Sequence, residues 1–164
     1  MDSAKLYKSG VTELSLGNHK KAFAIFRQVL DIEPSHTGAL VKQGNILGKF
    51  ARYDEAITYY DRALAVEPKN ELALLNKGLA LHYLERFEEA IACYDQVLQT
   101  RPDSTITKYN KASSLVRCGK VDDGIDVLAD AIKFDFSYKY KAQADIDFES
   151  IRESPKFVHL VGIE

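Results

Sequence analysis

Residues 53–68 read YDEAITYYDRALAVEP, and this stretch decides the fold. Its apolar residues recur at the spacing of one face of an α-helix; they are Ala56, Ile57, Tyr60, Ala63 and Leu64. Asp54 and Glu55 stand in the first turn, where carboxylates suit the positive end of the helix dipole. Pro68 cannot continue a helix. The stretch therefore predicts an amphipathic helix that ends before residue 68.

The preceding stretch, residues 39–50, reads ALVKQGNILGKF and predicts a second helix with its own apolar side chains. A short segment separates the two helices, so residues 37–70 predict one helix-turn-helix unit. Residues of the same kind recur every 34 positions on both sides of this unit. The recurring sets are Gly10, Gly44 and Gly78; Ala22, Ala56 and Ala90; Phe26, Tyr60 and Tyr94; and Pro34, Pro68 and Pro102.

The period defines three regular units, 3–36, 37–70 and 71–104, and a fourth, 105–138, that is degenerate. The fourth unit keeps the register but changes its signature residues, which become Lys108, Ala112, Gly124, Leu128 and Phe136. In the regular units a glycine inside a helix costs about 1 kcal/mol relative to alanine. Its recurrence predicts that two helices approach closely there, with the aromatic residue as the large partner of the small one.

The glycine, the Ala-x3-aromatic pair and the proline at this period resemble the tetratricopeptide repeat family over residues 3–138. The resemblance implies an all-α fold, a right-handed superhelical α-solenoid of helix-turn-helix repeats, formed by residues 1–164 as a single domain. It also implies a non-catalytic protein–protein interaction module, an adaptor or scaffold, that binds a peptide or helical segment in its concave groove.

The resemblance further indicates which side chains face that groove. The predicted peptide-binding residues are Tyr7, Lys8, Val11, Lys42, Asn45, Leu75, Asn76, Leu79, Tyr109 and Asn110. Amide side chains can pair with a peptide backbone, and the lysines can meet an acidic group. The family's known carboxylate clamp is incomplete here, because Val41, Ile106 and Asn110 occupy places where the clamp has other residues. The sequence therefore favours an apolar-leaning peptide over a chaperone tail.

Composition argues against several other functions. Lys and Arg number 22 against 24 Asp and Glu, a net charge of -2 that gives no basic face for nucleic acid. No apolar run is long enough for a membrane span, and the first residues do not read as a signal peptide, so we expect a cytoplasmic protein. Scattered histidines and two separated cysteines, Cys93 and Cys118, indicate no metal site, cofactor or enzyme activity.

Residues 139–164 do not repeat, but they contain short helical patterns and apolar side chains. Ser137, Asp147 and Ser154 are candidate helix caps, the last followed by Pro155. We expect this segment to be a C-terminal helical cap over the last repeat; the alternative is that it lies in a groove as an internal ligand. The fourth unit and the tail also allow self-assembly into a homodimer. Residues 133–141 alternate like a strand, but a lone strand would leave its backbone unpaired.

Overall fold

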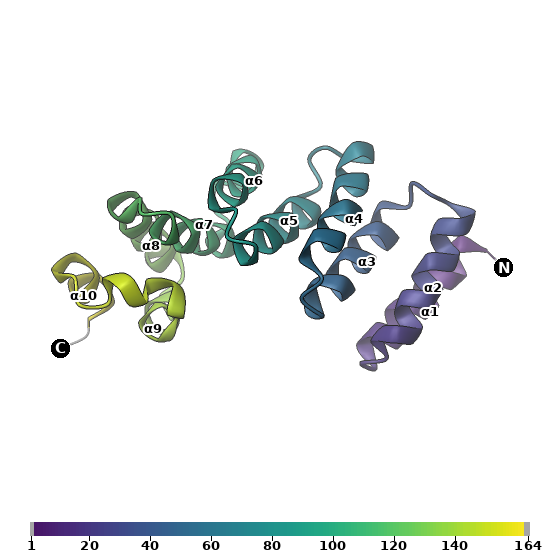
Figure 1. The fold of residues 1–164 in the computed structure, drawn as a ribbon, viewed down its shortest axis with the longest axis horizontal. Helices are drawn as coiled ribbons and strands as arrows, with labels where there is room; N and C mark the ends of the chain where they lie inside the picture. Colours follow the sequence, from purple (N-terminus) through teal and green to yellow (C-terminus); the bar gives the residue numbers. More distant parts are fainter. Residues whose placement is uncertain (1, 163–164) are drawn as a thin grey trace. The chain divides into compact units, whose positions relative to one another are not determined.

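A computed structural model of the protein describes residues 2–162, and within that range it contains helices and no strand (Figure 1). The predicted all-α solenoid of helix-turn-helix repeats is confirmed. The elements are α1 (Ser3–Ser15), α2 (His19–Ile32), α3 (Thr37–Lys49), α4 (Tyr53–Val66), α5 (Glu71–Tyr83), α6 (Phe87–Thr100), α7 (Thr105–Arg117), α8 (Val121–Phe134), α9 (Ser137–Ala144), the 3-10 helix η1 (Ile146–Ile151) and α10 (Pro155–Val161). The odd-numbered helices α1 to α7 begin 34 residues apart, and so do the even-numbered helices α2 to α8.

The chain divides into two compact units, of which one extends to Ala80 and the other begins at Leu81. The division falls inside α5, so the first unit contains α1 to α4 and most of α5. The second unit contains the end of α5 and all the helices that follow it. No helix of residues 2–162 has the length and apolar character that crossing a membrane requires.

In the first unit, α1 packs on α2, α2 on α3, and α3 on α4. The small residues lie where the period predicts close contact. A Cβ atom at Gly10 would come within 2.7 Å of the Phe26 ring, and one at Gly44 within 2.5 Å of the Tyr60 ring. Such distances are far below van der Waals contact, so only glycine allows these aromatic rings to lie against the neighbouring helix.

The fourth helix pair, α7 and α8, shows why the signature residues change together. Ala112 stands where the other units have glycine, and Gly124 stands where they have alanine. A Cβ atom on Gly124 would lie 2.7 Å from Val116 Cγ2 and 3.2 Å from the Ala112 carbonyl oxygen. The pair thus keeps a small residue at the crossing, but on the opposite helix.

Lys108 occupies the place of a core leucine and is almost fully buried. Its ammonium group pairs with the Asp130 carboxylate and lies 4.6 Å from the centre of the Phe134 ring. These contacts offset part of the cost of burying a charge.

The C-terminal segment consists of α9, η1 and α10, and it packs against α7 and α8. It adds fully buried apolar side chains to the core of the second unit: Ala142, Phe148, Phe157 and Val161. Residues 137–141 of the alternating stretch begin α9, because helix formation satisfies the backbone groups within the segment.

The predicted cap Ser154 is confirmed, since its hydroxyl accepts a hydrogen bond from the Phe157 amide. The other two predicted caps are wrong, because the N-cap residue is Phe136 for α9 and Asp145 for η1. Asp135 accepts hydrogen bonds from the backbone amide and hydroxyl of Ser137. Asp145, in turn, accepts from the backbone amide of Asp147. In both places an aspartate two positions earlier competes better for the first free amide of the helix.

Candidate functional site

Eight of the predicted binding residues lie in the first unit, on α1, α3 and the first part of α5. Lys8 is exposed, and the others are partly exposed: Tyr7, Val11, Lys42, Asn45, Leu75, Asn76 and Leu79. Val41, which shares their register, is instead buried in the core with Leu6 and Leu40. The partly exposed set therefore presents a mixed apolar and polar surface, which we call the first-helix surface.

Two asparagines of consecutive repeats are joined on this surface. The Asn76 amide nitrogen Nδ2 donates a hydrogen bond of 2.9 Å to Asn45 Oδ1. The Tyr60 hydroxyl donates a second hydrogen bond, also 2.9 Å, to the same oxygen. Burial raises the pKa of the Tyr60 hydroxyl above its ordinary value, so this group remains a neutral donor at physiological pH.

The shared acceptor fixes the orientation of both amides, and each retains a free polar group. Among residues 2–162, Asn45 Nδ2 and Asn76 Oδ1 have no hydrogen-bond partner. One donor and one acceptor thus remain for a ligand on these two partly exposed side chains. Sequence reasoning identified both asparagines but missed Tyr60, whose signal is a hydroxyl where the first unit has Phe26.

Tyr7 is held by aromatic neighbours at the other end of the first-helix surface. Its ring lies 4.6 Å from the His36 ring and 5.7 Å from the Phe26 ring, measured between centroids. A Cβ atom at Gly38 would lie 2.8 Å from the Tyr7 hydroxyl oxygen. Burial raises the pKa of Tyr7, and the absence of a side chain at Gly38 makes room for the hydroxyl.

The two predicted binding residues of the second unit have different surroundings. Tyr109 is 1% exposed, and its hydroxyl donates a 2.6 Å hydrogen bond to Asp145. Its ring stacks on Tyr138 with a centroid distance of 4.8 Å, and the Lys141 ammonium lies 4.3 Å from the ring centre. The C-terminal segment therefore covers Tyr109, so this side chain is not open to a ligand. Asn110 is partly exposed.

A buried polar group in the second unit superficially resembles a catalytic triad. His82 Nδ1 lies 2.8 Å from Ser114 Oγ, and His82 Nε2 lies 3.0 Å from Asp147 Oδ2. Ser114 is fully buried in the core of the unit, so a substrate cannot reach its hydroxyl. The arrangement instead ties η1 to α7 and to the end of α5.

Asp147 receives a further ion pair, because Arg117 Nη1 lies 2.9 Å from its Oδ1. Burial alone would raise the pKa of the Asp147 carboxyl, but the hydrogen bonds and charges of His82 and Arg117 hold it below its usual range. Within residues 2–162, no three His, Cys, Asp or Glu side chains gather as a metal site would require.

Comparisons with known proteins agree with this architecture. Two family models described as tetratricopeptide repeat match residues 6–36 and 41–105. This chain belongs to the tetratricopeptide repeat family. No curated protein sequence matches it.

Solved structures show the same fold at low sequence identity. MamA from Desulfovibrio magneticus RS-1 superposes with a TM-score of 0.81 at 22% identity, covering 87% of this chain and 81% of that one. YrrB, described as a TPR protein with an unusual peptide-binding site, gives a TM-score of 0.80 at 18% identity, covering 97% of this chain and 82% of that one. The Pseudomonas aeruginosa pilF protein gives a TM-score of 0.78 at 19% identity, covering 98% of this chain and 68% of that one.

Proposed function

We propose that this protein is a non-catalytic interaction module that binds a peptide or helical segment of another protein on the first-helix surface. The family supports an interaction role in general, and the finer assignment rests on the polar groups of α3 and α5. The observation that carries it is the Asn45–Asn76 pair, whose shared hydrogen bond leaves the Asn45 amide donor and the Asn76 carbonyl acceptor without a partner among residues 2–162.

A peptide backbone offers the complementary groups. Its carbonyl oxygen can accept from Asn45 Nδ2, and its N–H can donate to Asn76 Oδ1. Because Tyr60 and Asn76 already hold Asn45 in place, little side-chain freedom is lost when the peptide binds. Leu75 and Leu79, one turn apart on α5, supply apolar contacts beside this polar pair.

The lysines of the surface add a preference for negative charge. Lys8 and Lys42 have no carboxylate partner among the described residues, whereas Lys77 of α5 pairs with Asp61 at 2.6 Å. An acidic side chain or a terminal carboxylate on the ligand would meet these two ammonium groups. The incomplete carboxylate clamp argues against the chaperone tails that the complete clamp binds.

The test uses a substitution that keeps the internal contacts and removes the outward donor. Asn45→Asp retains an oxygen for Tyr60 and Asn76 but has no Nδ2 group, so we expect binding to weaken about tenfold, the cost of one hydrogen bond of about 1.4 kcal/mol. Peptides are first selected from a random display library on the wild-type protein, and their affinities are then measured by fluorescence anisotropy. Gln28→Glu, an exposed position on α2, is the control for the added charge.

The side-chain amide signals in NMR spectra show where the peptide binds. Saturation with a selected peptide should shift the amide signals of Asn45 and Asn76. Shifts that spare both asparagines, or equal affinity of Asn45→Asp and the wild type, would count against the proposal.

Self-assembly is the second candidate function, and one surface feature favours it. Large apolar side chains remain exposed near the end of α8 and on α9; they are Phe134, Phe136 and Tyr140. Phe136 and Tyr140 contact each other edge to face at a centroid distance of 5.8 Å. Light scattering of the wild type and of a Phe136→Ser, Tyr140→Ser variant tests this, since a dimer built on these rings would dissociate.

A cytoplasmic location is also proposed, with the support of two free cysteines, Cys93 and Cys118. Fractionation of cells that express the protein with a small epitope tag tests the location.

A further inference from the structure

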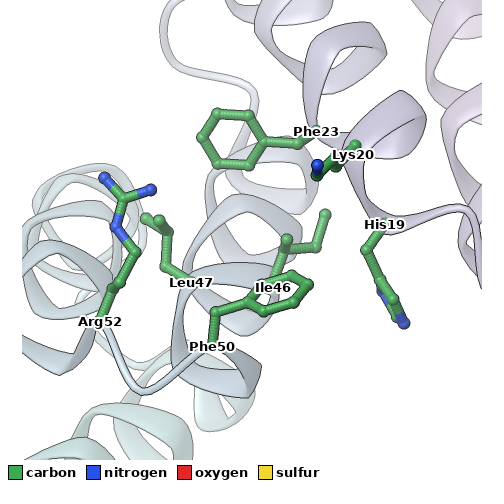
Figure 2. Close-up of a pocket in the computed structure, with 7 residues that line it drawn as sticks. All are labelled: His19, Lys20, Phe23, Ile46, Leu47, Phe50 and Arg52. Carbon is green, nitrogen blue, oxygen red and sulfur yellow. The ribbon is translucent and has the colours of Figure 1, made fainter.

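A pocket of about 290 Å³ opens in the first unit between α2 and α3 (Figure 2). Its walls are apolar and its rim is basic; the lining residues are His19, Lys20, Phe23, Ile46, Leu47, Phe50 and Arg52. None of these residues belongs to the first-helix surface. The volume corresponds to roughly ten liquid water molecules, enough for one large side chain and below the range of most drug-sized sites.

The apolar wall comes from the helical spacing of α3. Ile46 and Leu47 lie near the end of this helix, Phe50 directly follows it, and Phe23 of α2 lies opposite them (Figure 2). Ile46 and Leu47 are buried, but the Phe50 side chain is 54% exposed. An exposed aromatic ring at the mouth of an apolar pocket is the kind of surface that anchors a partner's side chain.

The rim carries positive charge. Lys20 is exposed and has no carboxylate partner among residues 2–162. Arg52 already binds Glu55 through two hydrogen bonds of 2.6 Å. Helices α4, α6 and α8 each carry two carboxylates in their first turn, whereas the first turn of α2 carries none. Lys21 in that turn pairs with Glu13 at 2.5 Å, so Lys20 supplies the ammonium group that has no carboxylate partner among residues 2–162. The potential at this end of α2 therefore favours a negatively charged partner.

A second, shallower depression continues the pocket across the turn before α2. It shares His19, Lys20 and Phe50 with the pocket and extends over Gly17 and Asn18. A side chain seated in the pocket would thus belong to a chain that continues past the basic end of α2. This continuity favours a peptide segment over an isolated small molecule.

We propose that this pocket is a second binding site, which takes a phenylalanine or leucine side chain of an acidic peptide segment from a partner protein. The apolar side chain fills the space among Phe23, Leu47 and Phe50. The flanking carboxylates of the peptide lie against Lys20 and the first turn of α2. A partner held here leaves the first-helix surface free for another segment.

The probe is the peptide acetyl-Gly-Glu-Phe-Asp-Glu-Gly-amide, titrated into the full chain while the methyl signals of Ile46 and Leu47 are followed by NMR. We expect these signals to shift in a saturable way. Two matched peptides test the chemistry: one replaces the three acidic residues by lysine, and the other replaces phenylalanine by alanine. Each should bind at least about tenfold more weakly, because the lysine peptide loses charge complementarity and the alanine peptide loses the aromatic anchor.

Two protein variants test the location. Phe50→Ala and Lys20→Glu alter exposed side chains, so the thermal midpoint should hold while affinity for the acidic peptide falls about tenfold. The proposal is overturned if the methyl signals stay unchanged at millimolar peptide, if the lysine peptide binds equally well, or if Phe50→Ala binds like the wild type.

Asn45→Asp separates this proposal from the proposed function. Binding of the acidic peptide should be unaffected by Asn45→Asp. If this variant loses the peptide and Phe50→Ala keeps it, the peptide binds the first-helix surface, and the pocket proposal fails while the proposed function stands.

Discussion

Gly44 lies directly beneath the ring of Tyr60, so close that a Cβ atom on the glycine would be 2.5 Å from Tyr60 Cε1. The hydroxyl of the same tyrosine donates a hydrogen bond to the side-chain oxygen of Asn45, the next residue of α3. The packing of the helix pair and the geometry of the candidate binding surface therefore depend on one aromatic ring.

Substitutions at two glycines of α3 should have opposite effects on stability. Gly44→Ala should destabilise the protein by about 1–3 kcal/mol, because the added methyl group overpacks the Tyr60 ring. Gly48→Ala should stabilise it by up to about 1 kcal/mol, because a Cβ there meets its nearest atom at 3.8 Å and alanine favours the helix. Chemical denaturation of both variants measures the two changes. A neutral Gly44→Ala would show that the helices can separate without cost.

The buried charge of Lys108 should be replaceable by the leucine of the regular repeats. Lys108→Leu should be neutral or stabilise the protein by about 1 kcal/mol, because it removes a desolvated ammonium group from a core position. Asp130→Ala should instead destabilise it, because the ammonium would lose its partner. Thermal unfolding of the single and double variants measures the coupling energy between Lys108 and Asp130. If Asp130→Ala remained harmless with Lys108 present, the ion pair would have no role in stability.

Acid should weaken the contact between η1 and the rest of the second unit through Asp147. Its pKa is lower in the folded state than in the unfolded state, so the carboxylate contributes stability above the unfolded value of about 3.9. That contribution is lost as the pH falls from about 4 through the folded pKa. Asp147→Asn should therefore show a shallower loss of stability below pH 4 in denaturation curves measured at several pH values. Equal acid slopes for both proteins would exclude this role for Asp147.

If the C-terminal segment caps the last repeat, the stability of the protein should depend strongly on Phe148. This side chain is fully buried between the rings of Tyr109 and Phe157, so Phe148→Ala should cost about 3–5 kcal/mol. Ile146→Ala, two residues earlier at an exposed position, is the matched control and should change stability little. Hydrogen exchange should also accelerate in α7 of the Phe148 variant. Unchanged exchange there would argue against a cap.

The regular part of the fold could be predicted because its packing recurs. The 34-residue period locates the starts of eight helices and the close contacts at Gly10 and Gly44. The C-terminal segment does not repeat, so its pattern indicated short helices but not their partners. The burial of Tyr109 under Tyr138 follows from that segment and could not be read from the register alone.

The candidate sites were predictable to different degrees. Asn45 and Asn76 stand at different repeat positions, since Asn76 corresponds to Lys42 and Asn45 to Leu79, and the sequence predicts both on one surface. Their mutual hydrogen bond depends on side-chain orientation, which Tyr60 helps to fix. The pocket was not predicted, because its lining comes from two repeats, with Phe23 from the first and Phe50 from the second.

Ala142 of α9 lies 34 residues after Lys108 and is buried like the residues at the corresponding places of the earlier units. The chain thus starts a fifth repeat in phase, but α9 stops at Ala144, before the place where the glycine would fall and where Ile146 stands. From there η1 turns back onto α7, and its Asp147 forms an ion pair with Arg117 of α7. Lengthening this array, by gene duplication or by design, would therefore require new units to be inserted ahead of Thr105, because the segment after α8 no longer forms a complete helix pair.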